Sequence, residues 1–264
     1  MSDHIGPFIV ERWPDRQAMG EGYHCETLEK VILKSSNTSP DLSSEAKVLR
    51  SLSGGAGIPA LHWFGKSHGQ MMMITEMAGV PLEHIFNQGG RYFELQILLE
   101  FAHQLICRLE WIHSRSVSHG NLNPAILTLG APSWQAPQVT ISNFGTAEFS
   151  QFSPRKDLED IGDIIIYFAT AYTSWDSFKA SKRHEQEVPS ILMAYFAIIR
   201  SQDLNLADYS TIRNHFDGAR QLLNRTLFGG ISDPEQQHLS LKNLSLKSTG
   251  DLFEDLGVNL TITN

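Results

Sequence analysis

The chain has very little cysteine: two residues, Cys25 and Cys107, among 264. Two cysteines cannot form the disulfide framework of a small secreted scaffold, so a reducing compartment is expected. Neither belongs to a Cys-x-x-Cys pair or to a Cys/His spacing that would favour a metal site. We therefore predict that both are buried structural thiols, the usual environment of free cysteine.

Long hydrophobic runs and basic tracts are also missing. The longest apolar stretch, Ile161 to Tyr172, is too short to span a bilayer and contains Asp163. The first residues, Met1 to Ile5, lack the basic and apolar regions of a signal peptide. A net charge of -8 and a pI near 5.7 argue against nucleic acid or an anionic membrane as partner. We expect a cytoplasmic or nuclear protein.

The first third of the chain has the alternation and β-branched content of strands. The predicted strands are Phe8–Val10, Lys30–Lys34, Leu61–Gly65 and Met71–Glu76, with a turn at His68-Gly69. One helical pattern interrupts them, with apolar residues at Leu42, Ala46, Leu49 and Leu52. Asp41 or Ser39 is its candidate cap, and the glycines from Gly54 to Gly57 end it.

The remainder is mostly helical in pattern, so the predicted fold class is α+β. Four helices are predicted, at Tyr92–Arg115, Asp157–Tyr172, Ile191–Ile199 and Tyr209–Leu223, with a short strand at Val139–Ile141. The second helix is apolar almost all round, which indicates a buried helix. Regularity is lost from about Leu227. The last part of the chain, which includes the acidic and apolar stretch Asp251–Leu256, is either a partly disordered tail or a segment that docks on a partner or back on the domain.

One ten-residue stretch carries the strongest functional signal. Val117 to Ile126 reads Val-Ser-His-Gly-Asn-Leu-Asn-Pro-Ala-Ile, which resembles the catalytic loop of eukaryotic protein kinases, His-Arg-Asp-Ile-Lys-Pro-Asp-Asn. Further along, Asn143-Phe144-Gly145 stands where kinases carry Asp-Phe-Gly. Other stretches are similar, in the same order, to motifs of the casein kinase 1 group. They are Gly54–Pro59, Glu76–Glu83, Gln104–His119, Asp157–Gly162 and Ala207–Phe216.

The resemblance covers roughly residues 5–225 and implies a bilobal kinase-like fold. It places a small β-rich N-lobe at 1–77, a helical C-lobe at 78–226 and a C-terminal tail at 227–264. In such a fold Lys34 would hold nucleotide phosphates and Glu45 would pair with it, although that ion pair could be purely structural. Adenine would bind at the hinge formed by Glu76, Met77 and Ala78. Thr75, at the gatekeeper position, would leave the back of this candidate ATP pocket open.

The same resemblance implies which reactive groups of a kinase this chain lacks. Asn121 replaces the catalytic Asp and cannot accept a proton from a substrate hydroxyl. Asn123 replaces the catalytic-loop Lys, which removes a cation from the transferring phosphate. Ile126 cannot bind a metal, and Asn143 offers a neutral carbonyl where Mg²⁺ prefers a carboxylate. No catalytic position is therefore intact, and no metal site is predicted.

Two further features depart from the kinase pattern. Gly20 and Gly22 are out of register for a phosphate-covering loop, and a turn between strands is their expected role. Only Thr146 to Lys156 separates Asn143-Phe144-Gly145 from Asp157, whereas the family carries a much longer activation segment and peptide platform there. A loop this short cannot build a docking site for an acceptor peptide.

The sequence therefore predicts a pseudokinase similar to casein kinase 1, a non-catalytic scaffold or regulator with a protein partner. It requires no cofactor; ATP is the candidate ligand, and the lost carboxylates argue against Mg²⁺. The alternatives are a weak or atypical ATP-dependent serine/threonine kinase, and an adaptor whose tail supplies the contact. A kinase-like fold alone does not decide between them, because function depends on the site.

Overall fold

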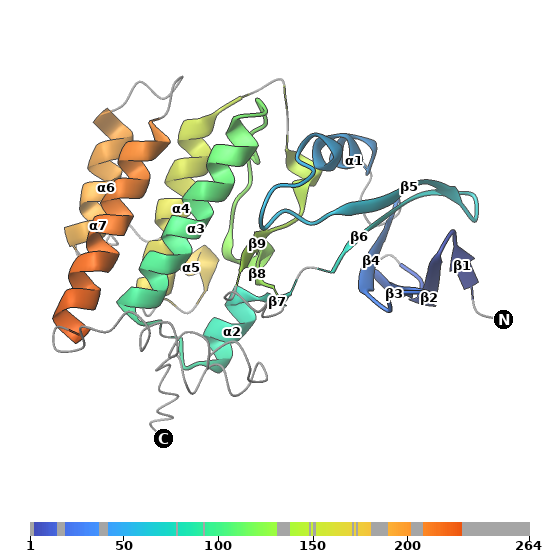
Figure 1. Ribbon diagram of the computed structural model, residues 1–264, viewed down its shortest axis with the longest axis horizontal. Coiled ribbons are helices and arrows are strands. Elements are labelled where there is room, and N and C mark those ends of the chain that lie inside the picture. The colour runs from blue at the N-terminus through green and yellow to red at the C-terminus, as the bar shows by residue number, and fades with distance from the viewer. Residues whose placement is uncertain are drawn as a thin grey trace.

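The computed structural model describes residues 3–14, 19–36, 42–77, 79–91, 93–130, 138–147, 149, 152–170, 172, 174–180, 190–201 and 208–228. Within these ranges the protein is a mixed α+β structure, as the sequence predicts. A six-stranded antiparallel sheet lies at one end and a group of helices at the other, with a small three-stranded sheet and helix α1 between them (Figure 1).

The large sheet has the strand order β1-β2-β3-β4-β6-β5, and every neighbouring pair is antiparallel. Its strands are β1 (Asp3–Ile5), β2 (Phe8–Arg12), β3 (Gly20–His24), β4 (Lys30–Ser35), β5 (Leu61–Ser67) and β6 (Gln70–Glu76). The pleat of β4 sends Val31 and Leu33 into a cluster of buried apolar side chains on one face of the sheet. Lys34 points to the other face, toward helix α1 (Leu42–Ser51).

The turn between β5 and β6 forms at His68-Gly69, as predicted. Both residues have positive φ, 49° and 79°, which is the backbone conformation of a tight two-residue hairpin turn. After β6 the chain forms β7 (Val80–Pro81) and α2 (Leu82–Gln88). Strand β7 pairs with β8 (Leu127–Leu129), which pairs in turn with β9 (Val139–Ile141). Gly79 is required at the start of β7, because a Cβ there would lie 1.7 Å from the Leu129 carbonyl oxygen.

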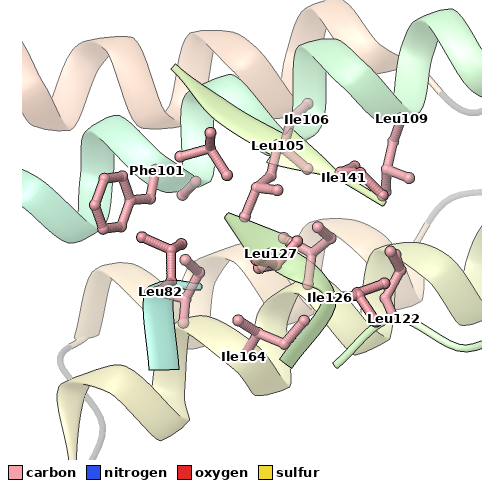
Figure 2. Close-up of a cluster of buried hydrophobic side chains, with 14 of the residues drawn as sticks. Leu82, Phe101, Leu105, Ile106, Leu109, Leu122, Ile126, Leu127, Ile141 and Ile164 are labelled. Carbon is pink, nitrogen blue, oxygen red and sulfur yellow. The ribbon is translucent and has the colours of Figure 1, made fainter. Parts of the chain in front are cut away.

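Four long helices form the other end of the molecule. They are α3 (Leu95–His113), α4 (Pro154–Ala169), α6 (Ser190–Ser201) and α7 (Tyr209–Phe228), with the short α5 (Trp175–Ala180) beside them. Helix α3 packs against both α4 and α7. Its Leu105, Ile106 and Leu109 face Ile126, Leu127 and Ile141 in a continuous hydrophobic core (Figure 2). This core extends to α1, so the helices and the large sheet share one packed interior.

The predicted elements are present with shifted boundaries. Helix α3 is shorter than predicted at both ends, and α4 begins three residues earlier, because Pro154 is well suited to the first turn of a helix. Helix α4 is buried along most of its length, as its apolar composition indicates. Helix α7 continues through Phe228, beyond the expected loss of regularity at Leu227. The proposed caps Ser39 and Asp41 and most of the tail, residues 229–264, lie outside the described residues.

Two predictions are wrong. Gly20 and Gly22 lie within β3 and not in a turn; a Cβ on Gly22 would come within 2.3 Å of the Ile9 carbonyl oxygen, so the close pairing of β2 and β3 explains this glycine. Cys25 is exposed and Cys107 is only half-buried, so neither is the deeply buried thiol that was expected. Cys25 lies in the turn after β3, on the surface of the protein. No helix in the described part of the chain is long and apolar enough to cross a membrane.

Candidate functional site

An ion pair joins the large sheet to α1, and it is formed by the two residues predicted to pair, Lys34 and Glu45. The Lys34 ammonium on β4 donates to Glu45 Oε1 at 2.6 Å, and the two residues are 7% and 1% exposed. Glu45 lies in the first turn of α1, where the helix dipole favours a carboxylate. Its other oxygen, Oε2, is buried and accepts no hydrogen bond from the part of the chain that the structure describes. The pair is therefore buried but not saturated, and retains capacity for a further hydrogen-bond donor.

The candidate hinge residues follow on β6. Thr75 is paired with Ile32 of β4, so it is buried on the same face of the sheet as Lys34. Glu76 is exposed, and its Oε2 accepts a hydrogen bond from the backbone N–H of Ala60 at 3.3 Å. Met77 is half-buried just beyond the strand, and Ala78 lies outside the described residues. Lys34, Glu45 and Thr75 thus line one face, while the Glu76 side chain is engaged elsewhere.

The loop that resembles a catalytic loop uses its asparagines for local structure. Asn123 precedes the short 3-10 helix η1 (Pro124–Ile126), and its Oδ1 accepts the Ala125 N–H at 3.1 Å. Its Nδ2 donates to the Asn121 carbonyl at 3.2 Å. Asn123 therefore acts as a helix cap, a role that this residue type performs well. Asn121 itself is exposed.

Ile126 and Asn143, which the resemblance aligns with the metal-binding positions of kinases, offer no acidic group. Ile126 is 7% exposed, and Figure 2 shows its side chain among those of Leu122 and Leu127, inside the hydrophobic core. Asn143 lies just after β9 with φ 63° and ψ 59°, a left-handed conformation that asparagine tolerates. Among the described residues, no three His, Cys, Asp or Glu side chains are grouped so that they could hold a metal ion. This donor set does not fit Mg²⁺, which needs carboxylate oxygens.

A buried carboxylate fixes the backbone of the same loop. Asp157, near the start of α4, is fully buried. Its Oδ2 accepts the His119 N–H at 2.7 Å, and its Oδ1 accepts the Gly120 N–H at 2.9 Å. His113, at the end of α3, adds a contact from its Nε2 at 2.9 Å. One side chain thus joins α3, α4 and the loop.

The protonation of this network follows from its surroundings. Burial acts to raise the pKa of Asp157, but the hydrogen bonds from His113, Gly120 and His119 outweigh it, so the pKa lies below its ordinary value. Burial lowers the pKa of His119, which therefore remains neutral with Nε2 bonded to the Ser142 carbonyl at 3.1 Å. Tyr209 of α7 contacts His113 Nδ1 through its hydroxyl, and burial, together with the Asp157 charge, raises the pKa of this phenol.

The predicted residues lie in two groups: Lys34, Glu45 and Thr75 on the large sheet and α1, and Ile126 and Asn143 near β8 and β9. Asn143 and Ile126 are joined through the β8–β9 hairpin, where the Ser142 N–H donates to the Ile126 carbonyl. The 3-10 helix η2 (Phe144–Thr146) follows Asn143 and packs on α1, the helix that carries Glu45. Sequence reasoning did not identify Asp157 as the residue that organises this region. An acidic residue at the start of an otherwise apolar, buried helix was the available signal.

No protein-family model matches the chain.

Breaking the Lys34–Glu45 pair on one side should destabilise the protein more than removing both charges. We expect Lys34→Met to lower the free energy of unfolding by about 3–5 kcal/mol, because it leaves the Glu45 carboxylate buried and unpaired. The double variant Lys34→Met/Glu45→Leu should recover most of this loss. Urea denaturation at pH 7 measures both, and equal destabilisation of the single and double variants would contradict a buried, desolvated pair.

Asp157→Asn should be destabilising because an amide cannot accept from all three donors. We expect a loss of about 2–5 kcal/mol at pH 7 by urea denaturation. Because the folded pKa of Asp157 is depressed, its contribution is present above the unfolded value of 3.8 and is lost as pH falls through the folded pKa. The gap between wild type and variant should therefore narrow in strong acid. A gap that stays constant from pH 7 to pH 2 would show that the carboxylate charge is not responsible.

Proposed function

We propose that this chain is a pseudokinase similar to the casein kinase 1 group: a bilobal kinase-like domain that acts as a non-catalytic protein-binding scaffold or regulator. The order of its elements supports this proposal. An antiparallel sheet and α1 come first, followed by the β8–β9 pair and then most of the helices. In this interpretation the N-lobe spans 1–77 and the C-lobe 78–226, and residues 227–264 form the tail.

One observation carries the non-catalytic part of the proposal. The position of a metal-binding asparagine is taken by Ile126, whose side chain is packed into the hydrophobic core. The positions of the two catalytic carboxylates hold Asn121 and Asn143, which are neutral. Phosphoryl transfer depends on positioned metal ions and on charge stabilisation around the transferring group. A site without these charges offers little acceleration.

The segment between Thr146 and Ser153 supports the same conclusion for peptide substrates. Thr146 donates from its hydroxyl to the His119 carbonyl at 3.3 Å, and the Ser153 N–H donates to Ser118 Oγ at 2.7 Å. Both contacts are to the loop that resembles a catalytic loop, so this short segment begins and ends against it. A connection of this length leaves no room for a platform that would align an acceptor peptide.

Retention of the Lys34–Glu45 pair favours one second candidate, a weak or atypical ATP-dependent kinase. The buried Lys34 ammonium donates to Glu45 Oε1. The other oxygen, Glu45 Oε2, receives no hydrogen bond from the described residues, so it could accept one from a bound molecule or water. These residues fit a nucleotide phosphate better than they fit a metal. When bound, ATP would supply the phosphoryl group, and Lys34 would orient its phosphates. Mg²⁺-independent transfer or a non-peptide acceptor belongs to this alternative.

A phosphotransfer assay tests the proposal directly. Casein and a panel of serine and threonine peptides should receive no more labelled phosphate from the wild-type protein than from the Lys34→Ala variant, with Mg²⁺, with Mn²⁺ or with no added metal. The Lys34→Ala variant controls for contaminating kinases, because it removes the one group that would position the phosphates. Transfer that depends on Lys34 would support the weak kinase and reject the scaffold.

A further inference from the structure

Helix α1 is attached to distant parts of the chain at successive turns. Glu45 pairs with Lys34 of the sheet, and the Arg50 guanidinium lies 5.6 Å from the ring centroid of Phe64 on β5. Just beyond the helix, the Leu52 carbonyl accepts a hydrogen bond from the Trp111 indole N–H at 3.1 Å. These contacts fix the ends of α1 relative to the sheet and to α3.

The chain after β9 adds a further attachment. Helix η2 packs along α1, and its Phe144 is buried in the core. Phe149 lies a few residues later, and the Lys47 ammonium of α1 is 5.2 Å from its ring centroid. Phe149 is 38% exposed, which is more than usual for a phenylalanine. A cation over an aromatic face is attractive even at the surface, so Lys47 accounts for the position of this ring.

The segment that carries these contacts is itself held at its two sides. Thr146 and Ser153 bond to the backbone of His119 and the side chain of Ser118, respectively. Those residues belong to the loop that Asp157 fixes. Phe149 therefore lies in the sequence between Thr146 and Ser153, two residues that are anchored to the loop fixed by Asp157.

We infer that η2 and Phe149 form a strap that holds α1 against the sheet and so keeps Glu45 next to Lys34. Helix α1 then acts as a fixed strut between the sheet and the helices and not as a switch. The inference concerns the packing of α1, and it stands whether or not the protein transfers phosphate.

Hydrogen exchange of the α1 amides in the full chain tests the strap. Phe149→Ser should increase the exchange rate of amides in residues 42–51 by about 2–5-fold, because it removes a contact of cation–π strength from the closed state. Lys47→Gln should have the same effect, while Lys47→Arg should exchange like wild type, because a guanidinium also binds an aromatic face. Amides of α3 should be unchanged in every variant, which shows that the protein has not unfolded globally.

Phe152→Ser is the matched control. Phe152 is 40% exposed and belongs to the same segment, but its ring packs against His113 of α3, with the ring centroids 5.6 Å apart. Its removal should leave exchange in residues 42–51 unchanged. The strap is refuted by wild-type exchange of α1 in Phe149→Ser, or by equal acceleration in Phe149→Ser and Phe152→Ser. Faster exchange of the α1 amides in Phe149→Ser but not in Lys47→Gln would also reject the Lys47 contact.

Discussion

The candidate site depends on one buried carboxylate, that of Asp157. It accepts the backbone N–H groups of His119 and Gly120 and contacts His113, so it sets the conformation of the loop that resembles a catalytic loop. Burying a charge in this way is costly unless its hydrogen bonds are all made, and here three donors converge on two oxygens. Because α3, α4 and α7 meet at this network, the loop is fixed by the core of the molecule.

In the proposed pseudokinase, the site would keep the shape of a phosphotransferase site but not its charges. The acidic residue that survives is structural, whereas the positions that would face a nucleotide or metal are occupied by amides and an isoleucine. Oriented electrostatic contacts of this kind are each worth on the order of 10²–10³ in rate, and their joint loss leaves little for chemistry. The described residues retain a buried ion pair and an α1 that contacts both the large sheet and the helices.

The longer elements could be predicted from the sequence because their periodicity is strong: β2, β4, β5, β6, α1, α3, α4, α6 and α7 were all expected. The short strand β9 was also expected, whereas β1, β7, β8, α2 and α5 have too few residues to show a period, and β3 was missed because its glycines indicate a turn. The Lys34–Glu45 pair was predicted and is present. The contacts of Asp157 and of Phe149 with Lys47 could not be predicted, because they join residues far apart in the chain whose approach depends on the packing of complete helices.

In the proposed pseudokinase, a site without acidic ligands does not gather divalent cations around a triphosphate. Water proton relaxation with Mn²⁺, a paramagnetic substitute for Mg²⁺, measures this directly. Adding the protein to Mn²⁺ and ATP should give no relaxation enhancement beyond that of Mn²⁺–ATP alone, whether or not the nucleotide binds. A strong enhancement that is lost in Asn143→Ala would show a metal seated at this position and would contradict the account.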